Sequence, residues 1–399
     1  MRVLMLSWEY PPYVIGGLGK HVAELVPALA QQDVEVHLVT PRWTGGDSTE
    51  KHDNLHIHRV DPPPPADGQD FHTLAWQANR NMEEESTRLL AQEGPFHLIH
   101  AHDWLTAFSA SALKHSFRLP LVVTIHATER GRGRGHLSTD TQWAINNVEW
   151  SLAYEAWRII ACSKFMTQEI VDYFNAPEDK IDIIPNGVDT SRFDRWDGVD
   201  LTSFRSMYAL PDEKIVFYVG RIVQEKGLHI LIETVPRILR SFPKAKFVIA
   251  GTGPLLSDLR RRTWELGLFS KVLFTGFIPD EDRDRLFKVA DCAIFPSMYE
   301  PFGIVALEAM AAKVPVVVSE VGGLKEVVQH AETGITVYPD NTESLAWGIL
   351  HTLEHPDWAQ ARVKSAYREV VNLYNWDRIA KLTRKVYERV VEERARASW

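Results

Sequence analysis

The sequence predicts an α/β protein made of two halves, each built around a parallel sheet. Short apolar runs alternate with segments of helical periodicity along the whole chain. Such continuous runs are typical of parallel strands that helices bury on both faces. The length of 399 residues is about two and a half typical domains, which favours two or three domains.

The apolar runs fall into two series. The first series predicts seven strands, over 3–6, 34–39, 55–60, 96–100, 119–126, 158–162 and 181–184. The second series predicts six, over 215–220, 246–251, 271–276, 293–295, 315–319 and 334–337. Each half therefore contains enough strands for its own sheet.

A connecting stretch separates the two series. Residues 193–213 are rich in Asp and Arg and end in a Pro-Asp pair, as inter-domain connections often do. We therefore expect domains over 1–197 and 198–374. Beyond these, apolar residues recur at helical spacing through Ile379 and Val386, which predicts a final helix over 375–399.

Composition excludes several classes of protein. The net charge of −9 argues against a chain held to nucleic acid or to an anionic membrane by bulk charge. The only cysteines, Cys162 and Cys292, cannot form a disulfide framework or a thiolate zinc site. Without a signal-peptide core or an apolar run of about 18 residues, the sequence predicts a cytoplasmic protein.

A glycine-rich turn over residues 16–19 follows the first expected strand and leads into a helix. Such a turn lets a ligand approach the backbone and directs N–H groups toward an anion. The spacing differs from the dinucleotide pattern, and the second strand ends at Arg42 without an acid for ribose, so NAD binding is disfavoured. A turn needed only for tight packing is the alternative.

Histidines gather near expected strand ends in the first half. His126 follows a buried strand and would lie at the carboxyl edge of the sheet, where ligands bind in open α/β folds. His100 and His102 share one face of a strand, but a metal site there needs a third partner that the sequence does not reveal. Most of the sixteen histidines are expected to be structural or solvated.

Two cations and a Gly-x-Gly turn follow strands of the second half. Arg221 and Lys226, five residues apart around a strand-to-helix turn, could reach one diphosphate from two sides. The alternative is two solvated side chains. The turn Gly251-Thr-Gly253 is a weak signal by itself.

The strongest motif runs from Ser297 to Ala312. Glu300 precedes Gly303, which opens a helix whose first N–H groups could bind an anion, and Glu308 lies one turn in from Ile304. Helix capping by Glu300 is the structural alternative, but it leaves Glu308 unexplained. Cations and N–H groups for phosphate, with carboxylates for hydroxyls, together indicate a sugar diphosphate.

These motifs resemble the retaining glycosyltransferases of family 4, which have the GT-B fold, over nearly the full chain. The resemblance includes Gly16 to Gly19, His126, Pro185 to Asp189, Arg221 with Lys226, Gly251 to Gly253, and Glu300 to Glu308. It implies two Rossmann-like domains facing a cleft, with the C-terminal helix packed on the N-terminal domain. Acceptor would bind residues 1–197, and the nucleotide sugar would bind 198–374.

The resemblance implies an expected catalytic set. Arg221 and Lys226 would neutralise the donor diphosphate, Glu300 would hold donor-sugar hydroxyls, and His126 would contact the sugar near the reacting carbon. The family is metal-independent, so no metal site and no cofactor are expected. Consistently, Asp280-Glu-Asp282 stands at a helix start, where acids complement the helix dipole.

The resemblance also implies a substrate-binding set. Backbone N–H groups of Gly303, Ile304 and Val305 would bind phosphate, Glu308 would bind ribose, and Gly17 would approach the phosphates. The remaining expected members are Gly16, Gly253 and Phe302.

The reaction is inferred from the available side chains. Double displacement needs a carboxylate nucleophile about 5 Å from its acid or base partner, and the sequence does not indicate such a pair. A front-face reaction, in which the departing phosphate takes the acceptor proton, fits better by resemblance.

The stretches Leu6–Pro12 and Thr124–Glu129 look like family members near glycogen and polysaccharide synthases. They favour transfer of glucose from UDP-glucose to a sugar, oligosaccharide or lipid-linked glycan acceptor, in polysaccharide or glycan biosynthesis. Alternatives are a nucleotide-sugar epimerase of the same fold and a non-catalytic nucleotide-sugar-binding subunit. A membrane-docked lipid glycosyltransferase is less favoured, because residues 81–85 are acidic and Arg130, Arg132 and Arg134 form the only nearby basic cluster.

Overall fold

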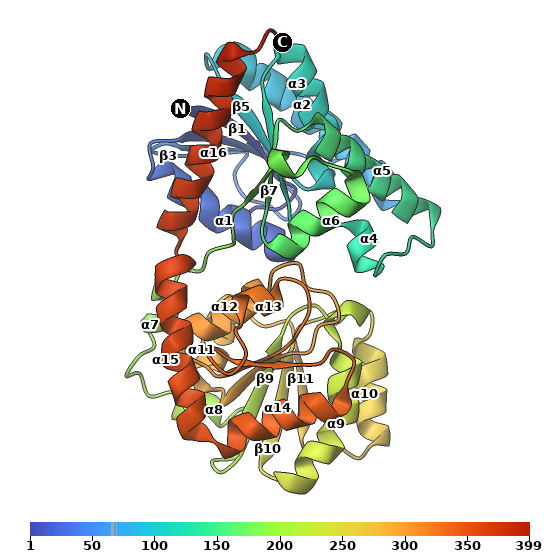
Figure 1. The fold of residues 1–399 in the computed structure, drawn as a ribbon, viewed down its shortest axis with the longest axis vertical. Coiled ribbons are helices and arrows are strands. Elements are labelled where there is room, and N and C mark those ends of the chain that lie inside the picture. Colours follow the sequence, from blue (N-terminus) through green and yellow to red (C-terminus); the bar gives the residue numbers. More distant parts are fainter. Residues whose placement is uncertain (65–67, 69) are drawn as a thin grey trace. The chain divides into compact units, whose positions relative to one another are not determined.

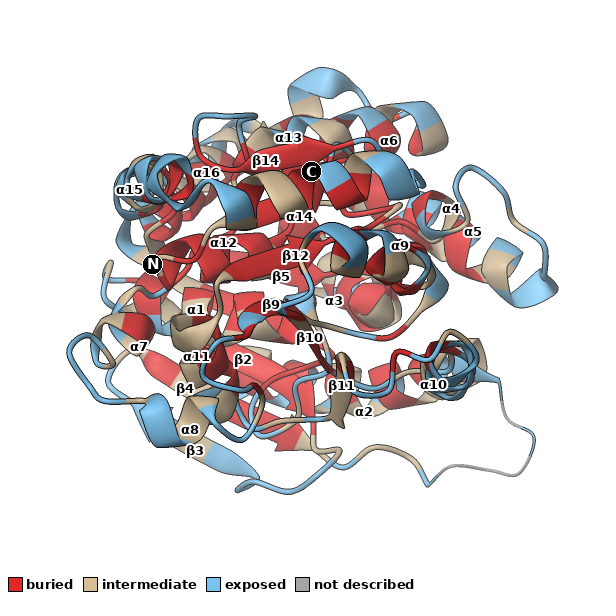
Figure 2. Cartoon of the chain, turned by 90° about the horizontal axis from the view of Figure 1, so that it is seen from below, coloured by how far each residue is buried: buried red, intermediate tan, exposed pale blue. Residues whose placement is uncertain are grey.

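The computed structural model describes residues 1–64, 68 and 70–399, which form two compact α/β units (Figure 1). The first unit contains Met1–Gly187 and Trp376–Trp399, and the second contains Val188–Asn375. Most strands of both units are buried, as Figure 2 shows by colour. The prediction of an α/β protein with two parallel sheets is confirmed.

The boundary between the units lies after residue 187, whereas the sequence led us to expect it after 197. The intervening segment contains helix α7 (Ser191–Asp194), which packs on the second unit. Phe193 is fully buried there, and its ring meets that of Phe287 edge to face at 6.1 Å. The segment looked like a linker because it is polar, yet one buried aromatic ring attaches it to the second core.

The first unit contains an eight-stranded sheet in the order β3-β4-β2-β1-β5-β6-β7-β8. The bounds are β1 (Arg2–Leu6), β2 (Glu35–Pro41), β3 (Thr49–His52), β4 (Leu55–Val60), β5 (Leu98–His102), β6 (Leu121–Ile125), β7 (Arg158–Ala161) and β8 (Ile181–Ile183). All neighbours pair in parallel except β3 and β4. The carboxyl ends of β1, β5 and β6 therefore lie side by side.

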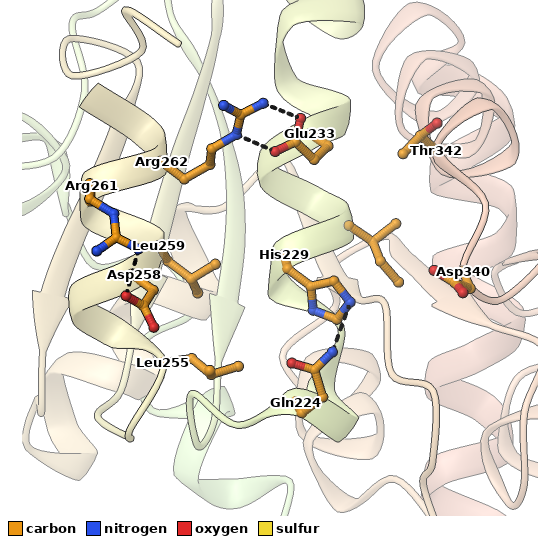
Figure 3. Close-up of a pocket in the computed structure, with 11 residues that line it drawn as sticks. Gln224, His229, Glu233, Leu255, Asp258, Leu259, Arg261, Arg262, Asp340 and Thr342 are labelled. Carbon is orange, nitrogen blue, oxygen red and sulfur yellow. Dashed lines mark hydrogen bonds and ion pairs between the residues drawn. The ribbon is translucent and has the colours of Figure 1, made fainter. Parts of the chain in front are cut away.

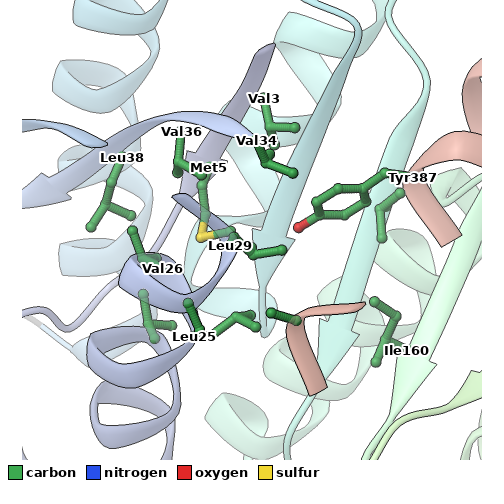
Figure 4. Close-up of a cluster of buried hydrophobic side chains, with 14 of the residues drawn as sticks. Val3, Met5, Leu25, Val26, Leu29, Val34, Val36, Leu38, Ile160 and Tyr387 are labelled. Atoms are coloured by element: carbon green, nitrogen blue, oxygen red, sulfur yellow. The ribbon is translucent and has the colours of Figure 1, made fainter. Parts of the chain in front are cut away.

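Helices cover this sheet, and the C-terminal helix is one of them. The helices are α1 (Gly17–Ala30), α2 (Phe71–Gln92), η1 (Trp104–Thr106), α3 (Ala107–Phe117), α4 (Glu129–Arg132), α5 (Asp140–Glu155), α6 (Lys164–Phe174), η2 (Glu178–Lys180) and α16 (Trp376–Arg396). Helix α16 packs against α1 and β5. Figure 4 shows Tyr387 of α16 within the same apolar cluster as Leu25, Leu29 and Met5. The predicted final helix and its packing on the first unit are confirmed.

The second unit contains a six-stranded, fully parallel sheet in the order β11-β10-β9-β12-β13-β14. The strands are β9 (Lys214–Val219), β10 (Ala245–Ala250), β11 (Val272–Gly276), β12 (Cys292–Phe295), β13 (Val316–Ser319) and β14 (Ile335–Val337). The helices are α7, α8 (Thr202–Arg205), η3 (Gln224–Lys226), α9 (Leu228–Ser241), α10 (Leu256–Glu265), α11 (Asp280–Val289), α12 (Ile304–Ala311), α13 (Leu324–Val327), α14 (Thr342–Glu354) and α15 (Pro356–Leu373). Within the described residues of both units, no helix is long and apolar enough to cross a bilayer.

Candidate functional site

Three neighbouring strands of the second unit, β10, β9 and β12, carry the predicted donor-binding motifs at one edge. Because the strands are parallel, their carboxyl ends meet there. The loops that follow them contain Gly253, Arg221 with Lys226, and Glu300. The sheet order therefore brings together motifs that lie up to 79 residues apart in sequence, from Arg221 to Glu300.

The loop after β9 is attached to the loop after β12 through its backbone. The Glu225 carbonyl accepts hydrogen bonds from the N–H groups of Met298 at 2.8 Å and Tyr299 at 3.3 Å. Gly227 has a φ of 69°, and a Cβ at this position would lie 1.9 Å from the Pro296 carbonyl oxygen. Glycine is therefore required here, and its close approach sets the position of Lys226 relative to the β12 loop.

Lys226 and Glu300 form the central pair of this edge. Lys226 Nζ lies 2.7 Å from Glu300 Oε2, and both side chains are largely buried, with exposed fractions of 18% and 12%. Ser297 Oγ donates to the same carboxylate oxygen at 3.3 Å. Among the described residues, none hydrogen-bonds Glu300 Oε1. The carboxylate can therefore hold the lysine and still accept a hydroxyl.

Arg221 lies on the more open side of the same loop. Its guanidinium is half exposed, and Nη2 lies 3.4 Å from Glu225 Oε1. Its backbone is held more firmly, because the buried Tyr218 hydroxyl donates to the Arg221 carbonyl at 3.0 Å. Burial raises the pKa of Tyr218, with the Glu300 charge adding to it, so this hydroxyl remains a donor. The guanidinium is therefore accessible from solvent, while the backbone of Arg221 is held by Tyr218.

Gly253 and Gly303 mark close approaches at this edge. A Cβ on Gly253 would lie 2.3 Å from the Ile222 carbonyl oxygen, so the β10 and β9 loops touch there. Gly303 begins α12 with a φ of 105°, and a Cβ would lie 2.6 Å from Leu324 Cδ2. The half-buried Ile304 and Val305 follow in the first helical turn, where N–H groups lack intrahelical partners.

Phe302 was expected to bind substrate, but its side chain belongs to the core. The ring is 5% exposed and lies 6.2 Å from the ring of Tyr374. The ring is thus packed in the core, and a contact between Phe302 and substrate stays a prediction.

Glu308 lies in a different ion cluster from Glu300. Its carboxylate is buried, and Oε1 lies 3.3 Å from Arg192 Nη1 and 3.9 Å from Arg283 Nη2. Asp284 shares both arginines, at 2.9 and 3.0 Å, and burial raises its pKa to about 6 despite the Arg192 charge. From the sequence we expected the Glu308 carboxylate to be open to ribose, whereas in the structure it lies between Arg192 and Arg283.

The acids at the start of α11 also have arginine partners. Asp280 Oδ1 lies 2.6 Å from Arg283 Nη1, and Asp282 Oδ1 lies 3.5 Å from Arg285 Nη1. These contacts agree with the interpretation of Asp280-Glu-Asp282 as a helix start.

In the first unit, the carboxyl ends of β5 and β6 and the start of α1 gather three imidazoles. His102 ends β5, His126 follows β6, and His21 lies in the first turns of α1. His102 Nδ1 lies 3.1 Å from His126 Nε2, and the ring centres of His21 and His126 are 4.7 Å apart. The sequence singled out His126 and His102 but missed His21, whose only signal is its position just after the glycine turn.

Each histidine of this region has a defined partner. His21 Nδ1 lies 2.6 Å from Asn186 Oδ1, and His100 contacts Thr124 Oγ1 at 2.8 Å and Tyr387 OH at 2.6 Å. The backbone N–H of His126 donates to Asp103 Oδ1 at 2.6 Å. His100 therefore bonds to helix α16 through Tyr387. The further metal-ligand candidates that the sequence did not reveal beside His102 are His21 and His126.

Burial keeps these imidazoles uncharged. It lowers the pKa values of His21, His100 and His102 well below the ordinary value and lowers that of His126 to about 3. Burial also raises the pKa of the neighbouring Asp103 to about 6. Near pH 7 this edge consists of neutral rings beside one carboxylate.

In the glycine turn of the first unit, the Glu9 carboxylate already accepts hydrogen bonds from two backbone N–H groups. The N–H groups of Ile15 and Gly16 donate to Glu9 Oε2 at 2.7 and 3.1 Å. Gly16 is the N-cap of α1 and Gly17 its first residue. An incoming phosphate would therefore meet the N–H groups of Gly17 and its successors rather than that of Gly16.

A separate cavity of about 450 Å³ lies along α9 and α10 (Figure 3). Its wall carries two ion pairs, Glu233 with Arg262 and Asp258 with Arg261, at 2.5 and 2.9 Å. Only Gln224 connects it to the Arg221–Lys226 loop. The cavity contains none of the predicted site residues.

Comparisons with known proteins cover both units. Residues 15–192 match the family described as Glycosyltransferase Family 4, and 202–369 match Glycosyl transferases group 1. The chain is 39% identical over 397 residues to an uncharacterized glycosyltransferase of Methanocaldococcus jannaschii, covering 98% of this chain and 99% of that protein. It is 35% identical over 399 residues to glycogen synthase of Mycobacterium tuberculosis, covering 97% and 94%.

Solved structures share this architecture. Sucrose-phosphate synthase from Thermosynechococcus elongatus superposes with a TM-score of 0.82 at 25% identity, covering 98% of this chain and 99% of that one. Anabaena HepE, solved in complex with UDP-glucose, gives a TM-score of 0.75 at 20% identity, covering 97% and 100%.

Proposed function

The chain belongs to glycosyltransferase family 4 and has the GT-B fold, and we propose that it transfers glucose from UDP-glucose to a sugar or glycan acceptor with retention of configuration. A nucleotide-sugar donor is the family's general feature. The glucosyl group is favoured by the glycogen synthase relative, and uridine by the HepE complex with UDP-glucose. The role of such a transferase would be polysaccharide or glycan biosynthesis, and cytoplasmic location stays a prediction.

The Lys226–Glu300 pair carries this proposal. A nucleotide sugar combines a diphosphate with a hydroxyl-rich ring, so its site needs a cation beside a hydrogen-bond acceptor. Lys226 supplies the charge, and Glu300 has an oxygen open to a hydroxyl while the other holds the lysine at 2.7 Å. The ammonium is thus positioned before the donor arrives, so stabilising the leaving diphosphate needs little rearrangement.

The other predicted residues complete the donor site in this proposal. Arg221 swings onto the diphosphate from its exposed position, and the N–H groups of Gly303, Ile304 and Val305 add to it at the start of α12. These cations and donors take the place of a divalent ion. Gly253 lets the β10 loop approach closely.

Glu308 serves the ribose in this proposal. Arg192 and Arg283 hold its carboxylate in place. Because the carboxylate is buried, ribose binding requires it to share or leave an arginine, so replacing Glu308 is expected to affect both donor affinity and stability.

Residues of the first unit are proposed to act on the sugar. His126 is a neutral ring that can hydrogen-bond a sugar hydroxyl near the reacting carbon, and Gly17 offers a backbone N–H to phosphate. In the front-face reaction, the acceptor hydroxyl oxygen bonds to the anomeric carbon as the carbon–phosphate oxygen bond breaks. The acceptor proton passes to the departing phosphate, which leaves as UDP.

A screen of nucleotide sugars against the full chain tests the function. We expect UDP release from UDP-glucose that depends on an added oligosaccharide, and a product with the donor's anomeric configuration by NMR. An altered sugar formed without acceptor would instead indicate an epimerase. Tight donor binding without release would indicate a binding subunit, and release from a different donor would overturn the UDP-glucose assignment.

A further inference from the structure

One group of ring nitrogens in the first unit has the composition of a metal site. His21, His102 and His126 each offer one nitrogen, and these three atoms all lie within 4.8 Å of one another. They come from α1, β5 and the loop after β6, elements that the order β1-β5-β6 brings to one edge. Imidazole nitrogens are ligands that zinc and related ions prefer.

His21 already presents a lone pair. Its Nδ1 lies 2.6 Å from Asn186 Oδ1, and an amide oxygen only accepts, so the proton belongs on Nδ1 and the lone pair on Nε2. Proteins usually orient a metal-binding histidine by an acceptor that bonds its other ring nitrogen, as Asn186 Oδ1 does here. His21 Nε2 is therefore prepared for a ligand.

Two of these nitrogens are buried without a hydrogen-bond partner. Within the described part of the chain, neither His21 Nε2 nor His102 Nε2 has one, although both rings are at least nine-tenths buried. Leaving a buried polar atom unpaired costs about 1–3 kcal/mol, so such atoms are uncommon unless something binds them. With His102 Nδ1 as the donor to His126 Nε2 at 3.1 Å, both unpartnered nitrogens carry lone pairs, which point to a ligand that accepts electron pairs.

A carboxylate lies beside the three rings. The backbone N–H of His126 donates to Asp103 Oδ1 at 2.6 Å, so this acid is held next to the cluster. A negative charge at this position favours a bound cation.

We propose that His21, His102 and His126 bind one divalent transition-metal ion of the zinc class, with a fourth position open to water or a hydroxyl. Zinc–nitrogen bonds of roughly 2.0–2.1 Å in a tetrahedral site place the nitrogens about 3.4 Å apart. The widest pair must therefore close by at most about 1.4 Å, because no separation exceeds 4.8 Å. His126, which follows the strand rather than lying within it, can supply that movement.

The ion is an inhibitor rather than a participant in transfer. A metal ion on His126 takes one ring nitrogen and fixes the ring within the cluster, so we expect occupancy to slow transfer and chelation to restore it. This inhibitory consequence rests on the proposed function. Metal binding itself does not.

A second group in the first unit serves as a control. Glu35, His37 and His56 also place one ligand atom each within 4.8 Å of one another. There, however, Arg2 Nη2 lies 2.9 Å from Glu35 Oε1, so a cation already occupies the carboxylate. The comparison predicts that His56→Gln leaves the metal affinity unchanged.

Cobalt titration of the full chain tests the proposal. After chelator treatment and dialysis, Co²⁺ is added and its visible d–d absorption recorded. We expect saturation at one ion per chain with the intense bands of tetrahedral coordination. His21→Gln and His102→Gln should each weaken cobalt binding at least about a hundredfold, more than the loss of a group that only bonds a metal ligand. His56→Gln should leave cobalt binding unchanged.

X-ray absorption on the Zn²⁺-loaded parent protein keeps the test independent of how the variants fold. Three imidazoles and one oxygen would support the site. Absence of saturable binding, unchanged affinity in folded His21→Gln and His102→Gln, or loss only in His56→Gln would overturn it. Cobalt binding without any glycosyl transfer would refute the proposed function and leave the metal site standing.

Discussion

The two units use opposite chemistry at the corresponding edges of their sheets. In the first, the buried His102 and the partly buried His126 are held as neutral rings. In the second, Lys226 and Glu300 form an ion pair at a loop that keeps contact with solvent. Burial without an opposite charge favours the neutral form of a group, whereas an opposite partner preserves the charged form. The second unit therefore suits a diphosphate, and the first suits hydroxyls or a coordinated ion.

The largest expected difference between the units is in their stability at acidic pH. Burial lowers the pKa of His58 to about 4, so the folded protein binds a proton there less readily than the unfolded chain does. The stability that the neutral ring provides is therefore fully present above pH 6.5 and is lost as the pH falls toward 4. The total loss in the free energy of unfolding is about 3 kcal/mol. His21, His37, His56, His100, His102 and His126 shift in the same direction. Calorimetry from pH 7.5 to 5 should show the first unit's transition falling steeply.

Two acids of the first unit oppose this trend, because burial raises the pKa values of Asp103 and Glu149. The second unit should change little, since the raised pKa of Asp284 favours stability in acid and offsets the lowered pKa of the partly buried His351, which acts against it. His58→Gln should flatten the acid loss, whereas His355→Gln, at an exposed position, should not. An equal loss of stability in both units on acidification would contradict this prediction.

Removing charge from the second unit should abolish most turnover. Lys226→Ala and Arg221→Ala should each lower kcat by roughly 10²–10³-fold, the scale for one preorganised charge-stabilising group. Lys214→Ala and Arg237→Ala are matched controls, because these half-exposed cations pair with Asp291 and Glu343 away from the loop. Steady-state UDP release measures the effect, and near-normal turnover in both test variants would refute the assignment.

Glu308→Gln should destabilise the second unit. The change leaves Arg192 and Arg283 with a weaker buried partner, for a loss of about 1–3 kcal/mol in the free energy of unfolding. The donor KM should rise as well. Glu343→Gln, at an exposed helix start, should leave the melting temperature unchanged. A Glu308→Gln protein as stable as the parent would show that the contacts of Glu308 with Arg192 and Arg283 do not stabilise the fold.

Chelation should produce the smallest change. In the proposed site Arg221 and Lys226 meet the charge of the diphosphate, so transfer in excess chelator should continue undiminished. It should rise if a metal had occupied the histidine cluster. Loss of activity that Mg²⁺ or Mn²⁺ restores would show that transfer depends on an ion.

The sequence predicted both sheets because continuous apolar runs report buried parallel strands. It missed β3, since Thr49–His52 is polar and largely exposed and is held by antiparallel pairing with β4. Pairing at a sheet edge depends on a neighbour, which local hydropathy does not report.

The candidate site was predictable where one loop carries it and less so where distant segments meet. The register from Gly303 to Glu308 indicates a helix start and one turn, but not that Arg192, 116 residues away, lies against Glu308. In the same way, His21 joins His102 and His126 only through the order of β1, β5 and β6. Long-range pairings of this kind need the fold.

Calorimetric titration of UDP into Glu300→Gln and Glu308→Gln tests the donor site most directly. Glu300 contacts the transferred sugar in this account, so Glu300→Gln should bind UDP nearly as well as the parent while its kcat falls. Glu308 contacts the ribose, so Glu308→Gln should bind UDP about tenfold more weakly, equivalent to about 1.4 kcal/mol. The reverse order of UDP affinities, measured on folded proteins, would contradict the assignment of the two glutamates.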